Sequence, residues 1–365
     1  MIQFIALTLF SFITAFLMAG KIIDTLYRFN VRKRLKIDLD TILETHKAKV
    51  GVPLMGGIIV ILPVLMINPV FNSDRNVLIL LTLILFAGII GLTDDLLTVF
   101  GHERLTFRVR ETVNPLVSFS ELSWLFYRLL LKPWRMIKEF FLGMGSQASG
   151  LRAHEKFILE LIIAGSAAAF LYFRMGLSSV WLPGLGPINI GIVYILWATL
   201  LMVGYASAFG LTDGLDGLSA GTHTLAFLAF GIIAFASGLF PLAFFCATVV
   251  GAELAFLYFN IYPARVEMSD VGTVPLGMAF ALVGILTGRE ILLPVIGLVF
   301  TLEILSSFLQ VVGVKHFKRK LFLMAPLHHH FEKLGWPETK VTMRLWWLGA
   351  ISGLTGIVLA FAFNR

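Results

Sequence analysis

Acidic residues and a run of three histidines lie where apolar segments of this chain end. The set comprises Asp94, Asp95, Asp213, Asp216, Asp270, His328, His329 and His330. Carboxylates are hard oxygen ligands that suit Mg²⁺, and imidazoles can bind diphosphate or transfer protons. Gathered at one face of a hydrophobic bundle, such groups predict a membrane-embedded enzyme that handles a metal ion and phosphates.

The composition indicates a polytopic membrane protein. Of the 365 residues, 58% are hydrophobic and only 14% are charged, whereas soluble domains are roughly half apolar and about a quarter charged. Apolar segments of about 20 residues, enough to cross a bilayer, recur along the chain. The ten predicted spans lie near residues 2–20, 53–71, 77–93, 157–173, 188–207, 222–240, 242–259, 274–288, 291–311 and 344–363. The expected fold class is an all-α membrane protein.

Basic residues are distributed unevenly between the two sides of this predicted bundle. With ten alternating spans, all 29 Lys and Arg residues fall on one side except Arg75, Arg174, Arg289 and Arg365. The positive-inside rule assigns the basic side to the cytoplasm. Both termini are therefore expected in the periplasm, and the active-site cleft is expected at the cytoplasmic face of a bacterial inner membrane.

One catalytic membrane domain is expected over residues 1–365, with a cytoplasmic insertion at residues 100–148. Within it, Ser120–Leu142 mixes aromatic and basic side chains and is divided by Pro133, which is typical of amphipathic helices at a membrane surface. An anchoring role is favoured over direct substrate binding. The net charge of +7 follows the membrane bias, so no nucleic-acid partner is expected, and a homodimer stays open.

Asp94 and Asp95 end the third predicted span. Adjacent helical residues point about 100° apart, so the two carboxylates are expected to have different roles. One can act on substrate while the other orients it or supports a metal. The alternative is that both acids only solvate the end of a helix.

Asp213 and Asp216 belong to a glycine-rich segment between two spans. Because they are three residues apart, they are predicted to share a helical face. Gly214 and Gly217 allow close approach of the backbone or a positive φ. Such a turn can offer amide groups to a phosphate or a nucleobase, and the alternative is a tight turn with solvated acids.

Asp270 lies just before the eighth predicted helix, where it could cap the helix N-terminus or bind Mg²⁺. The consecutive His328–His330 lack the i, i+4 spacing of a helical zinc site, so structural zinc is not expected. Inside the spans, Glu160, Glu253 and Glu303 are costly to bury, which makes them functional candidates. A neutral, hydrogen-bonded packing role is the alternative for each.

In their order along the chain, these motifs resemble those of the polyprenyl-phosphate N-acetylhexosamine-1-phosphate transferase superfamily. The resemblance covers nearly the whole chain apart from the insertion. It rests on residues 53–57, 94–95, 211–218, 260–273 and 325–338. The three histidines followed by Gly335-Trp336-Pro337-Glu338 favour the phospho-N-acetylmuramoyl-pentapeptide branch over the N-acetylglucosamine branch.

The resemblance implies a reaction between UDP-MurNAc-pentapeptide and undecaprenyl phosphate that gives lipid I and UMP, with Mg²⁺ as cofactor. It implies that Asp270 is the magnesium ligand and that Asp94 and Asp95 position or deprotonate the lipid phosphate. His328 matches an essential histidine and Lys156 a lysine of the catalytic cleft. The residues matching the uridine-site region are Lys49, Gly214, Leu215, Asp216 and Asn260. The other residues expected to bind substrate are Asp213, Glu267, Gln310, His329 and His330.

Several positions depart from the family pattern. Gly210 replaces the usual Asn before Leu-Thr-Asp, and Glu267 stands where an aromatic residue is common. Glu253 replaces a usual glycine, and Val52 and Leu54 replace threonines. Three rival interpretations stay open: a transferase of N-acetylglucosamine phosphate on the same fold, an ion-coupled transporter, and a catalytically silent homologue. Direct attack by the lipid phosphate ranks ahead of a covalent aspartyl-phosphate route.

Overall fold

The structure is a computed structural model that describes residues 1–32, 51–100, 151 and 153–362. Lys49 and almost all of the 100–148 insertion therefore lie outside the described residues. Within these ranges, eight helices are long and apolar enough to cross a membrane. They are α1 (Ile2–Arg28), α4 (Arg75–Phe100), α6 (Ala153–Met175), α7 (Val193–Thr212), α8 (Leu218–Ala236), α9 (Phe240–Asn260), α12 (Leu298–Phe317) and α14 (Glu338–Ala362).

Two shorter apolar helices, α3 (Ile58–Phe71) and α10 (Asp270–Leu286), coincide with the remaining predicted spans. The mostly helical, polytopic membrane architecture is thus confirmed. The count of ten crossings stays a prediction, because α3 has 14 residues and α10 has 17.

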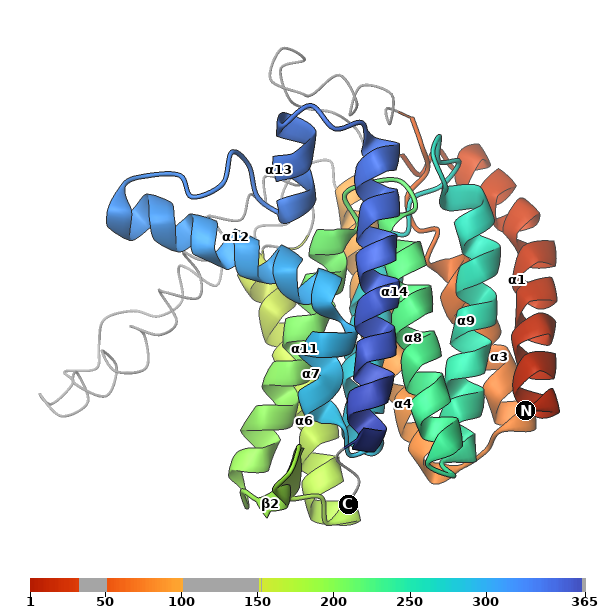
Figure 1. The fold of residues 1–365 in the computed structure, drawn as a ribbon. Coiled ribbons are helices and arrows are strands. Elements are labelled where there is room, and N and C mark those ends of the chain that lie inside the picture. The colour runs from red at the N-terminus through yellow and green to blue at the C-terminus, as the bar shows by residue number, and fades with distance from the viewer. Residues whose placement is uncertain (33–50, 101–150, 152, 363–365) are drawn as a thin grey trace, which may run out of the picture.

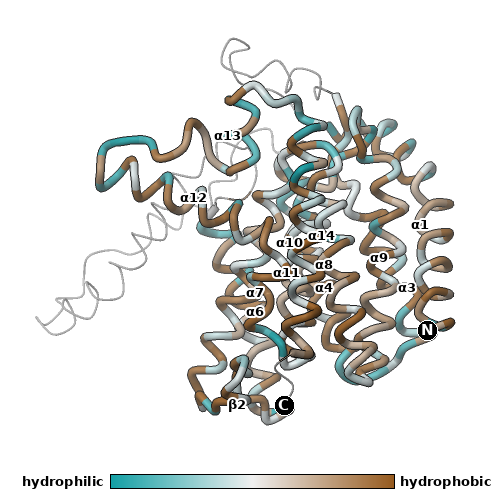
Figure 2. Tube along the Cα trace, in the orientation of Figure 1, coloured by the Kyte–Doolittle hydropathy of each residue, from teal (hydrophilic) through white to brown (hydrophobic). Residues whose placement is uncertain are grey.

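Helix α10 forms the centre of the bundle. Every residue from Val271 to Ile285 is buried, which is the pattern of a helix that is hydrophobic all round. It packs against α4 on one side and α7 on the other, while α9 packs against α1, α3 and α8. Figure 2 shows hydrophobic residues along the bundle and hydrophilic ones gathered toward the end where α13 (Leu327–Lys333) lies. The N-terminus of the buried α10 therefore sits inside a packed scaffold.

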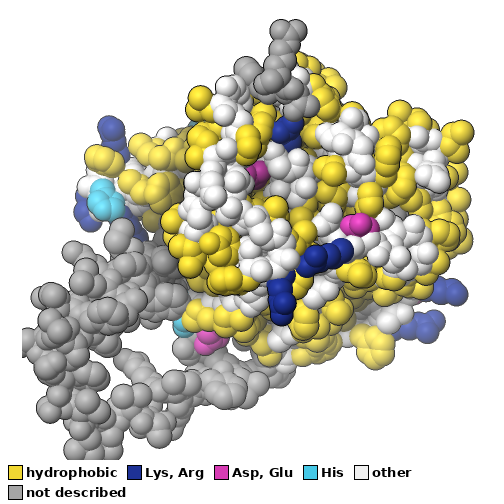
Figure 3. Space-filling view, turned by 90° about the horizontal axis from the view of Figure 1, so that it is seen from below, with side chains coloured by type: hydrophobic (Ala, Val, Ile, Leu, Met, Phe, Trp, Pro, Cys, Tyr) yellow, Lys and Arg dark blue, Asp and Glu magenta, His cyan; other side chains and the backbone are white. Residues whose placement is uncertain are grey.

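The start of α1 and the end of α14 lie at the same end of the bundle, opposite α13 (Figure 1). Seen from that end, the described surface carries mostly hydrophobic side chains and few charged ones (Figure 3). The two termini therefore lie at one end of the bundle, and the side of a membrane that this end faces stays a prediction.

Two predicted helix boundaries are wrong. Helix α4 does not end at Asp94–Asp95 but continues to Phe100, because the following residues are apolar and both carboxylates find partners inside the protein. Helix α7 ends at Thr212 and α8 begins at Leu218 after Gly217, whose φ is +75°. Asp213 and Asp216 consequently lie in a turn, the Asp213–Gly217 turn, and do not share a helical face.

The predicted span at 291–311 is divided. A 3₁₀ turn, η2 (Glu290–Leu292), leads into α11 (Leu293–Ile296), and α12 then leaves the bundle obliquely (Figure 1). The break lies at Gly297, where a Cβ would come 2.9 Å from the Leu293 carbonyl and 3.0 Å from the Phe280 ring. Close packing against α10 therefore accounts for a glycine at the bend.

A short antiparallel hairpin of β1 (Ser179–Leu182) and β2 (Gly186–Asn189) precedes α7. Its Trp181 N–H donates to Oε1 of Glu290 at 3.2 Å. The Arg289 guanidinium lies 4.1 Å from the centre of the Trp181 ring, a cation–π contact. Burial raises the pKa of the Glu290 carboxyl. These contacts fasten the hairpin to η2 at the end of the bundle remote from α13.

Candidate active site

A lysine and two aspartates from three helices meet at the end of the bundle where α13 lies. The Lys156 ammonium on α6 is 2.7 Å from Oδ2 of Asp270 on α10 and 3.3 Å from Oδ2 of Asp94 on α4. The Asp270 side chain is 29% exposed, against 11% for Asp94. An incoming anion can therefore reach Asp270 and Lys156, while Asp94 holds the lysine from behind.

Asp95 points away from its neighbour and fixes the start of α10. Its Oδ1 accepts a hydrogen bond from the Ser269 hydroxyl at 2.6 Å, and its Oδ2 accepts one from the Val271 N–H at 3.0 Å. Ser269, the N-cap of α10, has φ +64°, which non-glycine residues rarely adopt. The two adjacent aspartates thus have different partners, as their helical spacing predicts. The N-cap of α10 is thus Ser269 and not Asp270, for which capping was the structural alternative to binding Mg²⁺.

Gly91 lets α4 approach the residues that bear this cluster. A Cβ at Gly91 would lie 2.2 Å from the backbone oxygen of Asp270, and Gly91 is one helical turn before the aspartate pair. The close contact of the two backbones therefore sets the distance between Asp94, Asp95 and the N-terminus of α10.

Replacing Gly91 by alanine is expected to lower the free energy of unfolding by about 1–3 kcal/mol, the usual cost of overpacking, because backbone atoms of α10 must move. The measurement is the thermal unfolding midpoint in detergent. Gly88→Ala is the matched control on the same helix, since a Cβ there meets nothing within 4 Å. Equal midpoints for the two variants would contradict the close contact.

The Asp213–Gly217 turn is joined through its aspartates to the segment between α9 and α10. Asp213 Oδ2 accepts from the Ser269 N–H at 3.0 Å, and Asp216 Oδ2 accepts from the Ala264 N–H at 2.9 Å. The carboxylates are therefore not simply solvated, which was the alternative for this turn. They hold the connecting segment at two points, one of them directly before Asp270.

Backbone groups of the same turn bond to residues far away in the sequence. The Asp216 N–H donates to Oε1 of Glu338 at 2.6 Å, and the Gly217 N–H donates to Oδ1 of Asn260 at 3.1 Å. The indole N–H of Trp346 donates to the Gly217 carbonyl at 3.0 Å. Helices α9 and α14 thus fix the turn rigidly, and they leave Gly214 at its centre.

His328 lies against this turn. Its Nδ1 is 3.0 Å from Oε2 of Glu303, and both side chains are buried. A Cβ on Gly214 would come within 2.3 Å of His328 Nε2, so only glycine fits there. Among the described residues Nε2 has no hydrogen-bond partner. The imidazole therefore presents one nitrogen to the turn while Glu303 orients the other.

The two following histidines contact their own surroundings. His329 Nδ1 lies 2.7 Å from Oε2 of Glu332, one turn along α13. His330 Nδ1 accepts a backbone N–H from the 321–323 segment at 3.1 Å, and Gln310 makes three hydrogen bonds to the backbone of the same segment. These bonds direct His330 and Gln310 at the chain leading to α13, not at the Asp270 cluster.

The environment of His329 predicts a pH effect on stability. Burial lowers the pKa of this imidazole, and the hydrogen bond to Glu332 opposes the shift only in part. The unfolded chain then binds a proton more readily than the folded one, so stability falls as the pH drops below about 6.5. Thermal unfolding between pH 8 and pH 5 is expected to show a smaller loss in His329→Gln than in the wild type. His316 is exposed, so His316→Gln is the control and is expected to lose as much stability as the wild type. Equal losses in His316→Gln and His329→Gln would contradict the assignment of the pH effect to His329.

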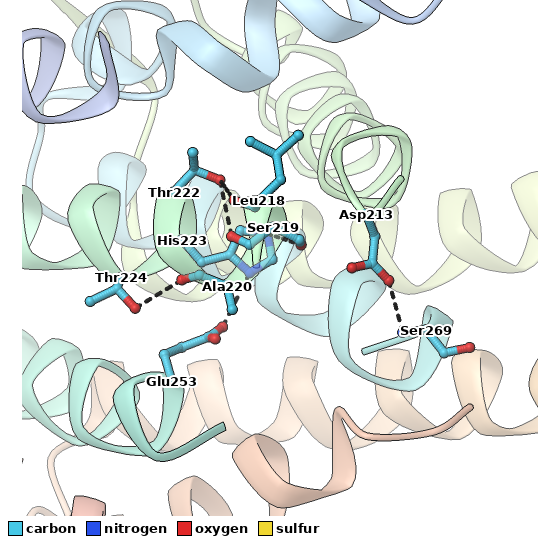
Figure 4. A network of polar contacts seen from close by, with 9 residues as sticks. All are labelled: Asp213, Leu218, Ser219, Ala220, Thr222, His223, Thr224, Glu253 and Ser269. Atoms are coloured by element: carbon cyan, nitrogen blue, oxygen red, sulfur yellow. Dashed lines mark hydrogen bonds and ion pairs between the residues drawn. The ribbon is translucent and has the colours of Figure 1, made fainter. Parts of the chain in front are cut away.

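A buried polar network lies behind the turn (Figure 4). His223 Nε2 is 3.0 Å from the Ser219 hydroxyl and its Nδ1 is 3.1 Å from Oε1 of Glu253. The His223 ring stacks on Phe209 with centroids 4.1 Å apart, and His223 and Glu253 are fully buried. Helices α8 and α9 are joined by this contact, which supports the packing alternative for Glu253.

Glu253→Ala is expected to lower the free energy of unfolding by about 1–3 kcal/mol, because it leaves the His223 nitrogen buried without its partner. Glu253→Gln is expected to cost less, since its side-chain oxygen can still accept the bond. Thermal unfolding midpoints measure both. Equal losses would indicate that the charge of Glu253, and not the hydrogen bond, carries the contact.

Glu267 takes part in the site through its backbone. Its N–H donates to the Pro53 carbonyl at 2.9 Å, and its carbonyl accepts from the Gly56 N–H at 2.8 Å. This pairing brings the 53–57 motif beside the segment that precedes Asp270. Motifs more than 200 residues apart are therefore neighbours, in agreement with the expectation that they form one site.

Two comparisons with known proteins identify the family of this chain. A family model described as glycosyl transferase family 4 matches residues 134–288. A phospho-N-acetylmuramoyl-pentapeptide-transferase from Geobacillus sp. (strain WCH70) is 35% identical over 323 residues, covering 87% of this chain and 86% of the relative. This chain belongs to the phospho-N-acetylmuramoyl-pentapeptide-transferase family. The relatives from Chloroflexus aurantiacus (strain J-10-fl) and Lactiplantibacillus plantarum are 34% and 31% identical, covering 97% and 94% of this chain and 88% and 96% of their own lengths.

Several residues that build this candidate site were not singled out from the sequence. They are Ser269, His223, Glu338, Trp346 and Thr342, whose hydroxyl donates to the Asp216 carbonyl at 3.3 Å. Glu338 entered only as part of the motif that follows the histidines, yet it is buried and binds the backbone of the Asp213–Gly217 turn. An acid at the first position of an apolar helix was the signal available for Glu338, whereas no local pattern marks the others.

Proposed function

We propose that the protein transfers phospho-MurNAc-pentapeptide from UDP-MurNAc-pentapeptide to undecaprenyl phosphate and releases lipid I and UMP. The observation that carries the proposal is the cluster of Asp270, Lys156 and Asp94 in a chain of this transferase family. Its relatives are named for the transfer of the phospho-N-acetylmuramoyl-pentapeptide group. Two anionic substrates need positive charge where they meet, and the Lys156 ammonium supplies it within reach of solvent.

In the proposed reaction, an oxygen of the lipid phosphate forms a bond to the β-phosphorus of the UDP-linked donor. The bond from that phosphorus to the bridging oxygen breaks, and UMP leaves with the electron pair. Lys156 attracts and orients the phosphates, and Asp94 holds the lysine at 3.3 Å. A phosphate needs little deprotonation at neutral pH, so this chain contributes chiefly positioning and electrostatic stabilisation.

Asp94 and Asp95 are assigned different roles. Both oxygens of Asp95 accept hydrogen bonds from residues 269 and 271, so Asp95 is assigned to positioning Asp270. Asp94 is assigned to the acceptor side, where it orients Lys156. Direct attack stays the first choice over an aspartyl-phosphate intermediate. UMP exchanging into the donor without any lipid acceptor would reverse that order.

The donor set suits Mg²⁺, which prefers oxygen ligands and typically takes one or two carboxylates with substrate phosphates. Two carboxylates, Asp270 and Asp94, already face one cation, the Lys156 ammonium. A Cβ on Gly210 would lie 3.9 Å from Asp270 Oδ1 and 3.7 Å from the Thr273 hydroxyl. That hydroxyl is buried and lacks a hydrogen-bond partner among the described residues. Asp270 is therefore the residue proposed to hold the ion, which would neutralise the donor diphosphate.

The donor is proposed to lie over the Asp213–Gly217 turn. Gly214 and the Nε2 of His328 meet there, and the buried imidazole, oriented by Glu303, is proposed to support the turn on which the donor lies. The side chains of Asp216 and Asn260 are occupied by bonds to backbone groups, so we assign them to shaping the pocket. Leu215 is buried under it. Lys49, Glu267 and the other residues expected to bind substrate are still proposed to do so.

The end of the bundle that carries α13 is proposed to face the cytoplasm, with ten crossings, both termini in the periplasm and residence in the inner membrane. The soluble donor is made of charged groups, so its site must open to water on the cytoplasmic side. The uneven distribution of basic residues supports this orientation.

The deciding experiment measures UMP release from UDP-MurNAc-pentapeptide by purified protein supplied with undecaprenyl phosphate. Release is expected only with Mg²⁺ and only with the wild type, not with Asp270→Ala. A parallel assay with UDP-N-acetylglucosamine is expected to give no product. Activity restricted to the N-acetylglucosamine donor, or release that ignores Mg²⁺, would overturn the proposal in one of its parts.

A further inference from the structure

A groove lies between α4 and α6 in the half of the bundle remote from the Asp270 cluster. Its volume is about 520 Å³, within the usual range for sites that bind small molecules. Its walls are mostly aliphatic and aromatic, with Leu78 and Phe86 on α4 and Ile162 and Phe170 on α6. All four side chains are exposed, so the groove opens on the outer surface of the bundle.

The two hydroxyl groups that line this groove do not add polar character. Thr82 donates to the Leu78 carbonyl and Ser166 donates to the Ile162 carbonyl, each at 2.7 Å and within its own helix. Between α4 and α6 the groove therefore offers its occupant an apolar channel to which neither hydroxyl adds a free donor. A soluble, polar ligand would lose its hydration there without compensation.

A charged side chain lies at the end of the channel. Arg75, the first residue of α4, lines the groove, is exposed, and donates to the Arg174 carbonyl at 3.2 Å. Its guanidinium lies 5.7 Å from the centre of the Phe170 ring. Within the part of the chain that the structure describes, no carboxylate pairs with it. An apolar channel that ends at an uncompensated guanidinium fits a ligand with one hydrocarbon chain and one anionic head.

We propose that this groove binds an acyl chain of an anionic phospholipid, whose phosphate pairs with Arg75. Guanidinium and phosphate form strong charge-assisted hydrogen bonds. Asp94 lies nineteen residues after Arg75, about 28 Å along the helix, which is close to the thickness of the hydrocarbon core. The lipid head is therefore at the opposite membrane surface from the catalytic cluster, so the occupant is not the lipid acceptor in a reacting position.

The position of the groove gives the bound lipid a role. Helix α4 carries Asp94 and α6 carries Lys156, and the two side chains meet at 3.3 Å beyond the groove. A chain packed between the same helices adds contacts that hold them at a fixed separation. Binding is thus expected to stabilise the protein through the α4–α6 pair, independently of which donor the enzyme uses.

The test measures binding of dioleoyl-phosphatidylglycerol and dioleoyl-phosphatidylcholine to the purified protein by native mass spectrometry and by thermal unfolding. The wild type is expected to retain phosphatidylglycerol preferentially and to unfold at a higher temperature with it. Arg75→Gln is expected to weaken that binding about tenfold, and to weaken binding of phosphatidylcholine, whose phosphate is offset by its own choline cation, much less. Arg28→Gln, an exposed arginine at the end of α1, is the matched control and is expected to behave as the wild type.

A second variant, Thr82→Trp, fills the channel and is expected to abolish the stabilisation by phosphatidylglycerol without changing the unfolding midpoint in plain detergent. Equal binding of phosphatidylglycerol by wild type and Arg75→Gln would overturn the proposal. So would displacement of the bound lipid by undecaprenyl phosphate at equal concentration, which would identify the acceptor as the occupant. A dimer lost in Thr82→Trp would identify a second copy of the chain instead.

Discussion

Asp270→Asn is expected to lower kcat/KM by about 10³-fold or more, with folding preserved. The substitution keeps the shape of the side chain but removes the charge that faces Lys156 at 2.7 Å and that is proposed to hold Mg²⁺. Losing one preorganised electrostatic contact to the reacting phosphates typically costs about 10²–10³ in rate, and the metal site adds to this loss. The measurement is UMP release over a range of Mg²⁺ concentrations, and the variant is expected to need more Mg²⁺ for any residual rate.

Asp74→Asn provides the matched control. Asp74 lies just before α4 at the opposite end of the bundle, and its carboxylate accepts a hydrogen bond from the Asn76 N–H. This variant is expected to retain wild-type activity. Retention of more than a tenth of the activity by Asp270→Asn would remove Asp270 from the centre of the mechanism, whatever the control does.

Lys156→Met is expected to lower kcat/KM by about 10²–10³-fold, because the aliphatic part is kept while the ammonium between two carboxylates is lost. Asp94 and Asp270 then repel each other and the incoming phosphates. Lys156→Arg is expected to restore part of the activity, since a guanidinium is positive but differs in shape. Steady-state kinetics with both substrates varied will show whether kcat or KM carries the loss.

A double variant tests the contact itself. If Lys156 and Asp94 act together, Lys156→Met combined with Asp94→Asn is expected to lose less than the product of the two single losses. The control for charge alone is Lys21→Met, an exposed lysine on α1, which is expected to leave activity unchanged. Fully multiplicative losses would show that the two residues act independently.

The fold was predictable where hydrophobicity alone decides it. Long apolar runs mark helices such as α9 and α14, because about 20 such residues suffice to cross a bilayer. The divergence of Asp94 and Asp95 followed from helix geometry. Helix ends were less predictable. Local sequence gave no sign that α4 continues past its aspartates, since their partners come from residues 151, 156, 269 and 271.

Which residues belong to the site was more predictable from the sequence than how they are arranged. The spacing of Asp213 and Asp216 suggested a helical face, but the turn and its bonds to the 264–269 segment depend on tertiary packing. Likewise, the pairing of His223 with Glu253 joins residues 30 apart on two helices. A resemblance to a family names the residues that meet, whereas contacts such as Gly91 against Asp270 appear only when helices are packed.

The hydrogen bond from Ser269 to Asp213 has a thermodynamic consequence. Ser269 is the residue before Asp270, so the turn proposed to lie under the nucleotide and the carboxylate proposed to hold the metal share one backbone. If a ligand bound at the turn changes the affinity of the carboxylate for the metal, the metal must change the affinity of the turn for that ligand by the same factor, because coupling free energies are reciprocal. Binding of UMP is therefore expected to raise the affinity for Mg²⁺ as much as Mg²⁺ raises the affinity for UMP, even in the absence of turnover.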